Sequence, residues 1–278
     1  MCRVLNVSKS GYYAWLQRQA TPLSEREIRN QEMAKQIFQA FVNSRGLYGS
    51  PRIQAELVAN GQVVSVKKVA NMMKEMGLEA TAPKATFKKA KKSSNPAYPN
   101  ELNRAFNVGE LNKVWVADIT YIRTVEGWAY LATVMDLGSR KIIGWAIDHH
   151  MEESLISEAL RQALRVRKPE NNWIHHSDQG SQYTSLEYIK LLNEQQATIS
   201  MSQKGTPADN ACIEAFHSSI KKECIYRQKI ETIAEAKKLV EAYIVYFYNE
   251  RRRHSSLGYL SPNQYERNLL QQQQLCAS

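Results

Sequence analysis

Apolar residues recur at helical spacing in the first part of the chain, where polar stretches separate three predicted helices. Ser24 and Glu27 match a capping box, so we expect the first helix to begin there. Pro51 predicts the start of the second helix, because proline fits the first helical position. Ser65 is a typical N-cap and Gly77 a typical stop for the third. The residues expected to face inward are Ile28, Ile37, Phe38 and Phe41, then Ile53 and Leu57, then Val66, Val69, Met73 and Met76.

Three short helices joined by such turns are typical of a helix-turn-helix region that binds DNA. We therefore expect residues 21–82 to form an all-α domain of this kind, with Lys67, Lys68 and Lys74 exposed toward DNA on the third helix. The alternative is a small helical bundle with solvated lysines. Residues 1–20 are similar to the later half of a further helix-turn-helix, as if the chain began inside a motif.

From residue 114 onward, short β-branched and aromatic runs alternate with helical segments. The predicted strands are 114–122, 127–136, 141–147, 172–176 and 198–202, and the predicted helices are 152–167, 186–195, 211–226 and 233–248. Turn residues join the first three strands into a meander. The order of elements resembles the ribonuclease-H-like fold. We therefore expect an α/β core of about five strands with flanking helices over residues 109–228, preceded by the all-α region.

Three acidic residues occupy distinct settings in this core. Asp118 lies in the middle of an apolar strand (Val-Trp-Val-Ala-Asp-Ile-Thr-Tyr), where a lone carboxylate is costly unless it is paired or bound to a metal. Asp178 follows a short strand (His-His-Ser-Asp-Gln-Gly), at a position where open α/β sheets place ligands. Glu214 lies near the first turn of a helix, with Lys221 two turns later on the same face. We predict that the three carboxylates converge within a few ångströms.

Carboxylate oxygens are the ligands that Mg²⁺ prefers, and three clustered acids would repel one another without a cation. Two ions roughly 3.5–4 Å apart can stabilise both the attacking and the leaving oxygen of an in-line phosphoryl displacement. We therefore expect Mg²⁺ or Mn²⁺, as two ions, with water and then a freed 3′-hydroxyl as nucleophiles. Spacing alone is a weak signal: with five Asp and 22 Glu, chance gives about 0.4 pairs at the interval between Asp178 and Glu214.

The net charge of +10 is distributed unevenly. Residues 1–110 hold 17 basic and 8 acidic groups, whereas the rest of the chain holds 20 and 19. Basic side chains in the first part can displace the counterions condensed on DNA. We expect residues 83–108 to form a basic linker whose lysines contact successive phosphate groups of DNA. The alternative is a linker that is merely solvated. The candidate DNA-binding residues of this linker are Lys84, Lys88, Lys89, Lys91 and Lys92.

Several other polar residues receive structural interpretations first. We expect residues 229–278 to form a C-terminal helix, a basic turn and a tail, with a frayed end at residues 271–274. The turn residues Arg251, Arg252 and Arg253 could contact DNA or a second protomer, or simply form a surface turn. Asp209 or Asn210 is expected to cap the helix that follows. His175 and His176 are expected to pack or form hydrogen bonds, His217 to pack unless it neighbours a ligand, and Asp136 and Asp148 to form turns.

The four cysteines show no metal-type pairing, and no secretory segment or long apolar span is present. Residues 1–110 contain no histidine, which excludes a zinc knuckle of histidine and cysteine before the core. We expect a cytoplasmic, nucleoid-associated protein.

Over almost its whole length, the chain resembles the transposases of bacterial insertion sequences of the large family numbered three, in the second-reading-frame (OrfB) form. The phrases that carry the resemblance are Tyr-Gly-Ser-Pro-Arg-Ile from Tyr48, Trp-Val-Ala-Asp-Ile-Thr-Tyr from Trp115, Asp-Leu-Gly-Ser-Arg from Asp136, His-Ser-Asp-Gln-Gly-Ser-Gln-Tyr from His176, Asp-Asn-Ala from Asp209 and Tyr-Asn-Glu-Arg-Arg-Arg-His from Tyr248. The 35 residues between Asp178 and Glu214 match the interval of retroviral integrases and related transposases.

This resemblance implies an enzyme whose Asp118, Asp178 and Glu214 hold the metal ions, and which cuts double-stranded DNA at element ends and inserts it into target DNA. It also implies a homo-oligomer on DNA and a possible fusion with the upstream-frame product. Two alternatives stay open: a ribonuclease-H-type nuclease that cuts without joining, and a DNA-binding regulator without catalysis.

Overall fold

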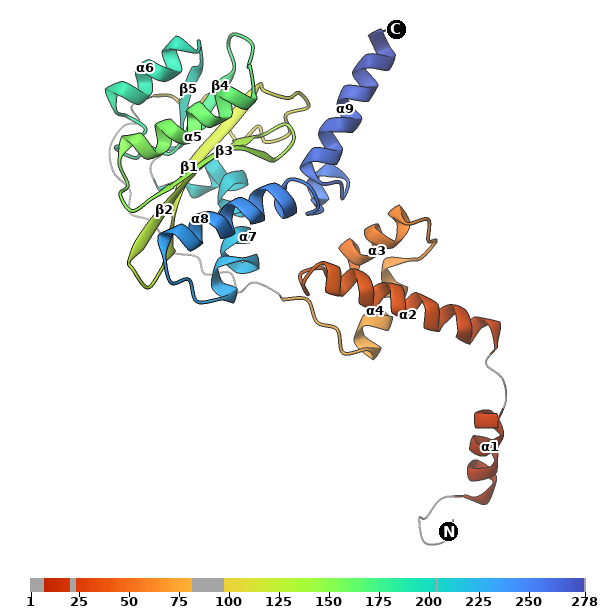
Figure 1. Cartoon of the computed structure of the whole chain (residues 1–278). Coiled ribbons are helices and arrows are strands. Elements are labelled where there is room, and N and C mark those ends of the chain that lie inside the picture. The colour runs from red at the N-terminus through yellow and green to blue at the C-terminus, as the bar shows by residue number, and fades with distance from the viewer. Residues whose placement is uncertain (1–7, 21–23, 82–97, 204, 278) are drawn as a thin grey trace. The chain divides into compact units, whose positions relative to one another are not determined.

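Residues 8–20, 24–81, 98–203 and 205–277 are described by the computed structural model of the chain. The chain forms two units, Met1–Ala82 and Pro83–Ser278. Figure 1 shows helices in the first unit and a sheet flanked by helices in the second. The helices of the first unit are α1 (Lys9–Ala20), α2 (Glu25–Asn43), α3 (Ser50–Ala59) and α4 (Val66–Glu75).

The start of α2 confirms the predicted capping box. Ser24 N–H donates to Glu27 Oε2 at 2.8 Å, and Glu27 N–H donates to Ser24 Oγ at 3.3 Å. The buried apolar residues of α2, α3 and α4 include Ile37, Ile53, Leu57, Val69 and Met73, as expected. The prediction was wrong for Ile28 and Phe38, which are about half exposed, and for Val66, which is 41% exposed in the first turn of α4. Ile28 lies in the first turn of the long α2, and Phe38 is rotated about 100° from the buried Ile37.

The second unit is built on a five-stranded sheet with the strand order β3-β2-β1-β4-β5. β1 pairs with β2, and β2 with β3, in antiparallel fashion, whereas β1 with β4 and β4 with β5 are parallel. This is the predicted meander followed by two crossovers. The strands are β1 (Val114–Arg123), β2 (Trp128–Asp136), β3 (Lys141–Asp148), β4 (Ile174–Ser177) and β5 (Thr198–Met201).

Each face of the sheet carries its own apolar core, because side chains alternate between the two faces of a strand. On one face, Trp115 and Ala117 of β1 pack with α5 (Glu153–Val166) and α6 (Leu186–Glu194). On the other, Val114 and Val116 pack with α7 (Ala211–Glu223) and the helices after it. The sheet is therefore the middle layer of an α/β/α arrangement, and β1 lies at its centre (Figure 1).

The C-terminal part continues as α8 (Ile233–Ala242), a π-helical turn η3 (Tyr243–Tyr248) and α9 (Pro262–Ala277), with short 3₁₀ turns η2 (Ile225–Arg227) and η4 (Ser255–Leu257). The prediction of a frayed tail at residues 271–274 was wrong, because these glutamines belong to α9. Glutamine is a good helix former. Ser261 and Gln264 also form a capping box that the sequence analysis missed, with Gln264 N–H donating to Ser261 Oγ at 3.3 Å and Ser261 N–H to Gln264 Oε1 at 3.2 Å.

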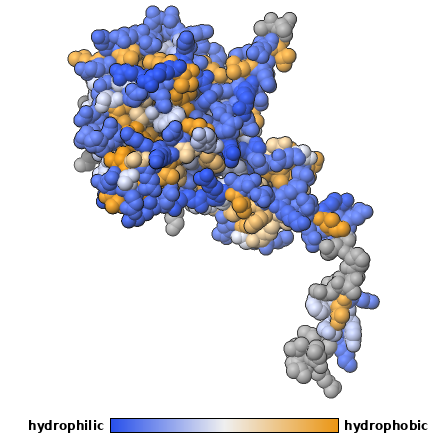
Figure 2. Space-filling model, viewed as in Figure 1, coloured by the Kyte–Doolittle hydropathy of each residue, from blue (hydrophilic) through white to orange (hydrophobic). Residues whose placement is uncertain are grey.

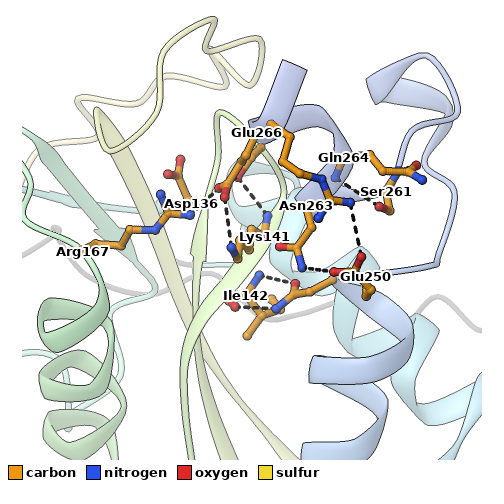
Figure 3. Close-up of polar contacts among 12 residues, drawn as sticks. Asp136, Lys141, Ile142, Arg167, Glu250, Ser261, Asn263, Gln264 and Glu266 are labelled. Atoms are coloured by element: carbon orange, nitrogen blue, oxygen red, sulfur yellow. Dashed lines mark hydrogen bonds and ion pairs between the residues drawn. The ribbon is translucent and has the colours of Figure 1, made fainter. Parts of the chain in front are cut away.

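A buried carboxylate attaches α9 to the sheet (Figure 3). Glu266 accepts hydrogen bonds from Lys141 Nζ at 3.0 Å and from Ser139 Oγ at 2.8 Å, and it also pairs with Arg167. Arg167 also acts electrostatically on the neighbouring buried Asp136. Breaking a buried pair by removing one partner is costly, so this network holds α9 against β3 and α5.

Asn249 covers the outer edge of β3 near this network. Its amide nitrogen donates to Ile142 O at 2.9 Å, and its amide oxygen accepts from Ile142 N–H at 3.1 Å. The side chain thereby satisfies backbone groups of the edge strand that a further strand would otherwise pair with. The visible face of the molecule is mostly hydrophilic, with separate hydrophobic patches (Figure 2). None of the helices that the structure describes is long and apolar enough to cross a membrane.

We predict that Gly144→Ala destabilises the second unit. A Cβ atom at Gly144 would lie 2.1 Å from Ala159 O and 2.9 Å from Ala163 N, so β3 and α5 would have to separate. Such overpacking costs about 3 kcal/mol in free energy of unfolding. The control is Gly109→Ala, whose Cβ would meet no atom within 4 Å. Urea unfolding followed by tryptophan fluorescence measures both, and equal stability of the two variants would contradict the packing argument.

Candidate active site

The register of the parallel strands brings Asp118 and Asp178 to the same level. Val116 of β1 lies opposite His176 of β4. Continuing this register by two residues places Asp118 beside Asp178, one residue past the end of β4. Asp118 itself is the fifth residue of β1, near the middle of the strand as predicted.

The start of α7 closes the site from a third direction. Asn210 donates from Nδ2 to Ala117 O at 3.1 Å, next to Asp118. Asp209 accepts from Gln203 N–H at 3.1 Å and from Arg104 Nε at 2.7 Å, which holds the loop before α7. Asn210 is the N-cap residue of α7, as expected, although neither its side chain nor that of Asp209 forms a capping hydrogen bond. Both are instead used for contacts with distant segments, and Glu214 follows in the first turn of α7.

A buried histidine orients Asp118. His217 Nδ1 lies 3.2 Å from Asp118 Oδ2, and His217 Nε2 lies 2.8 Å from Thr133 Oγ1. With the proton on Nδ1, the imidazole donates to the carboxylate and accepts from the threonine hydroxyl. Asp118 Oδ1 also accepts from the Ile119 N–H at 2.9 Å. Asp118 therefore has two anchored oxygens while its side chain stays about one fifth exposed.

The three acids line one cleft of about 340 Å³. Burial raises the pKa of Asp178, and the Asp118 carboxylate raises it further. Burial likewise raises the pKa of Glu214, with added contributions from Asp118 and Asp178. Asp178 thus feels the charge of Asp118, and Glu214 feels the charges of both aspartates. The other residues that line the cleft are Gln179, Gly180, Ser202, Gln203, Gly205, Thr206 and Asn210.

The cleft has features that fit a cation, although it is not a closed metal site. Within the described ranges, no three His, Cys, Asp or Glu side chains are grouped so that they could hold an ion as they stand. The oxygen-rich lining nevertheless suits a hard cation. Asn210 Oδ1 is buried without a hydrogen-bond partner among the described residues, and so is the Tyr183 hydroxyl. Asp118 and Asp178 act electrostatically on that hydroxyl, and Asn210 lines the cleft itself.

Lys221 lies beside the acids, as its spacing from Glu214 predicted. Burial lowers the pKa of this half-buried lysine, while the Asp118 carboxylate raises it. Its Nζ lies 4.2 Å from the centroid of the Tyr121 ring. The cation therefore contacts an exposed aromatic ring and also feels the charge of Asp118.

The other candidate DNA contacts lie on α4, in the linker, and in the basic turn that contains Arg251, Arg252 and Arg253. Lys67, Lys68 and Lys74 are exposed on α4, and the first two line a groove between α2 and α4. The linker residues Lys84, Lys88, Lys89, Lys91 and Lys92 lie outside the described residues.

The expectation for Arg252 and Arg253 is corrected, because both are buried. Arg252 forms a bidentate ion pair with Glu223 and donates to Ser219 Oγ, and Arg253 donates to Tyr259 O. Arg251 is exposed.

Structural roles were expected for His175, His176, Asp136 and Asp148, and all four form hydrogen bonds within the fold. His176 contacts the hydroxyls of Ser200 and Ser202 at 2.8 and 3.0 Å, and burial lowers its pKa to about 4. His175 contacts Tyr188, and burial lowers its pKa to about 3. Asp136 accepts from Asn112 and Gly138 N–H groups, and Asp148 accepts from His149 N–H.

Sequence reasoning missed Thr133, Asn210 and Tyr183 and left His217 undecided. Thr133 is an ordinary buried residue in its local context, and no pattern marked it. Tyr183 ends the phrase that begins at His176, but no role was predicted for it. The Asp-Asn-Ala phrase did include Asn210, but its contact with Ala117 joins residues 93 positions apart.

Three family models match parts of the chain. A family model described as an integrase core domain matches residues 110–207, and a second with the same description matches residues 195–262. A model described as an HTH-like domain matches residues 27–86. Among solved structures, the catalytic core domain of BIV integrase has a TM-score of 0.44 at 16% identity, covering 58% of this chain and 98% of that one. The HTLV-2 integrase catalytic core domain in complex with magnesium has a TM-score of 0.40 at 15% identity, covering 52% and 92%.

Sequence relatives extend over nearly the whole chain. The insertion element IS600 uncharacterized 31 kDa protein of Shigella sonnei is 38% identical over 264 residues, which is 94% of this chain and 96% of that protein. Transposase InsF for insertion sequence IS3A of Escherichia coli strain K12 is 41% identical over 267 residues, which is 96% of this chain and 92% of that protein. An identity of this size over this length shows that the chain belongs to the IS3 family of insertion-sequence transposases.

Proposed function

We propose that this transposase cleaves phosphodiester bonds at the ends of an insertion element and joins the freed 3′-hydroxyl to target DNA, with Asp118, Asp178 and Glu214 as the metal-binding residues. The observation that carries the proposal is the cleft itself. Carboxylates from β1, from the end of β4 and from α7 line it together. Burial raises the pKa values of Asp178 and Glu214, and the neighbouring carboxylates raise them further. Mutual repulsion of this kind is what bound cations relieve.

The three carboxylates would hold Mg²⁺ or Mn²⁺, as two ions. Such a pair of ions stabilises the attacking and leaving oxygens of a phosphoryl transfer. The chain's own residues prepare the site for this. His217 and Thr133 keep Asp118 turned toward the cleft, and Lys221 places a cation beside it for the DNA backbone. Water, and later the 3′-hydroxyl, serve as nucleophiles, so no side chain is required to form a covalent intermediate.

The rest of the chain serves DNA recognition and assembly in this proposal. Residues 21–82 bind double-stranded DNA at the element ends, with residues 1–20 as a partial helix-turn-helix, 83–108 as a basic linker, 109–228 as the catalytic core and 229–278 as a C-terminal extension. Two ends must be brought together, which favours a homo-oligomer on DNA, and the upstream-frame product is a further partner in this proposal.

We predict that Asp118→Asn, Asp178→Asn and Glu214→Gln each reduce cleavage and joining at least about a hundredfold, because loss of one ligand removes several kcal/mol of transition-state stabilisation. Duplex DNA binding should persist, and EDTA should have the same effect on the unmodified chain. A labelled element end, incubated with Mg²⁺ and target DNA, separates cut from joined products on a gel.

The matched control for the acids is Glu194→Gln, an exposed carboxylate at the end of α6 that should leave both steps unchanged. Full joining by any of the three acid variants would refute the site, and cleavage without joining by the unmodified chain would favour a simple nuclease.

The raised pKa of Asp178 predicts a stability change of definite sign. The folded chain binds this proton more tightly than the unfolded chain, so the contribution of Asp178 is present at low pH and is lost as pH rises through the raised pKa. Asp178→Asn removes the charge but keeps an oxygen for the Gly180 N–H, which lies 2.9 Å away. Without metal, the variant should be more stable than the unmodified chain at about pH 7 and equal to it at about pH 3.

Asp148→Asn is the control for this measurement, and the expected sign is reversed. The backbone N–H of His149 lowers the pKa of Asp148, so its contribution is present at neutral pH and is lost as pH falls. Urea midpoints in EDTA at several pH values give both curves. A lower stability of Asp178→Asn at neutral pH would contradict the electrostatic description of the cleft.

We predict that Lys67→Ala and Lys68→Ala weaken binding to element ends and reduce its salt dependence, each by about one unit of the logarithmic slope. Both lysines are exposed on α4. Lys238→Ala, an exposed lysine of α8, is the control. Fluorescence anisotropy over a range of salt concentrations measures the slopes, and equal slopes for all three variants would argue against phosphate contacts by α4.

A further inference from the structure

Four side chains form a strip in which two neighbouring aromatic rings are flanked by two cations, one of them on the helix that carries Glu214. Lys221 Nζ lies 4.2 Å from the centroid of the Tyr121 ring. The rings of Tyr121 and Trp128 meet edge to face, with centroids 5.3 Å apart. Arg123 Cζ lies 5.0 Å from the centroid of the Trp128 ring. We call these four residues the aromatic–basic strip. It starts on the helix that carries Glu214 and ends at the tip of the β1–β2 hairpin.

The pairing of β1 with β2 explains why these residues lie together. Tyr121 pairs with Tyr130, and Arg123 pairs with Trp128. Residues two apart on a strand share a face, and directly paired residues share it too. Tyr121 and Trp128 are therefore diagonal neighbours on one face of the hairpin. Both are far from buried, with 57% and 44% of their surface exposed.

The hairpin that carries the strip is held in place by the segment before α8. Val125 N–H donates to Ile230 O at 3.0 Å, and Glu126 N–H donates to Glu231 O at 3.2 Å. Ile233 N–H in turn donates to a carboxylate oxygen of Glu126 at 2.9 Å. Figure 1 shows the hairpin extending past the other strands near the start of α8. The rings are thus presented on an anchored support rather than on a free loop.

The chemistry of the strip fits unpaired nucleotides. Exposed aromatic rings stack on the faces of bases, and neighbouring cations contact the phosphates between them. In a duplex the base faces are already stacked on one another, so these rings suit a strand whose bases have separated. Lys221 lies two turns after Glu214 on α7, and Glu214 lines the cleft, so the nucleotides concerned adjoin the phosphodiester in the cleft.

We propose that the aromatic–basic strip binds unpaired nucleotides of the DNA end that flanks the cleft. Tyr121 and Trp128 stack on bases, while Lys221 and Arg123 contact phosphates. This inference rests on the proposed function and deepens it, because it names a locally separated DNA end as the form of substrate that the site receives.

The test measures binding of the full chain, in EDTA, to one labelled duplex in three forms: blunt, with a single-stranded thymidine tail, and with an abasic tail of equal charge. The unmodified chain should bind the thymidine tail about tenfold more tightly than the abasic tail. Tyr121→Leu and Trp128→Leu should each weaken thymidine-tail binding about fivefold and leave the other two forms unchanged. Lys221→Gln and Arg123→Gln should weaken both tailed forms alike.

Matched variants keep the test informative. Tyr246→Leu removes another exposed ring, on η3, and should change nothing. Trp128→Phe and Tyr121→Phe keep a ring and should retain most of the thymidine preference, which a folding defect would not do. Equal affinity of Trp128→Leu and the unmodified chain for the thymidine tail would overturn the proposal, and so would equal losses on thymidine and abasic tails. A changed oligomeric state with unchanged DNA binding would instead assign the rings to contacts between protomers.

The result is independent of the catalytic proposal, because no reaction occurs in EDTA. Loss of joining in the acid variants tests the cleft, whereas the thymidine preference tests the strip. Failure of one therefore does not imply failure of the other.

Discussion

The site depends on the point at which β1 loses its parallel neighbour. β4 pairs with β1 only over residues 114–116, whereas β2 follows β1 as far as Arg123. Beyond Val116 one edge of β1 is open, and Asn210 bonds to the Ala117 carbonyl there. A carboxylate at the next position reaches a cleft instead of an apolar core. The end of β4 therefore explains both how Asp118 is tolerated in an apolar strand and why Asp178 lies beside it.

Buried polar contacts away from the cleft determine where the third acid lies. Arg252 pairs with Glu223 near the end of α7, and Tyr243 donates to the same carboxylate at 2.7 Å. Arg140 donates to Cys212 at the start of α7 and to Phe106 O. A buried ion pair contributes little net stability, but breaking it is costly. The orientation of α7, and with it the direction of Glu214, is thus held at both ends of the helix.

Local sequence patterns predicted the helices, the strands and the three candidate acidic residues, because these features depend on residues that are close in sequence. Apolar runs fix the strands of the core, and the turn after β4 marks Asp178. Contacts between distant segments could not be predicted in this way. Asparagine often caps helices through its side chain, but the side chain of Asn210 donates to the exposed edge of β1 instead. Residues 271–274 have the composition of a disordered tail, but they continue a capped helix that Glu266 attaches to the sheet.

Charge gave the least reliable predictions, since a cation's role depends on its partners. Arg252 lies in a basic turn, yet its guanidinium is satisfied by Glu223 inside the fold. Lys221 differs, because its described contact is with the ring of Tyr121. A cation–π contact is worth roughly 0.5–1 kcal/mol at an exposed site, whereas hydrogen bonds to charged groups contribute about 1.5–3 kcal/mol. Lys221 can therefore exchange the ring for a phosphate at a net gain, and the ring it leaves becomes available to a base.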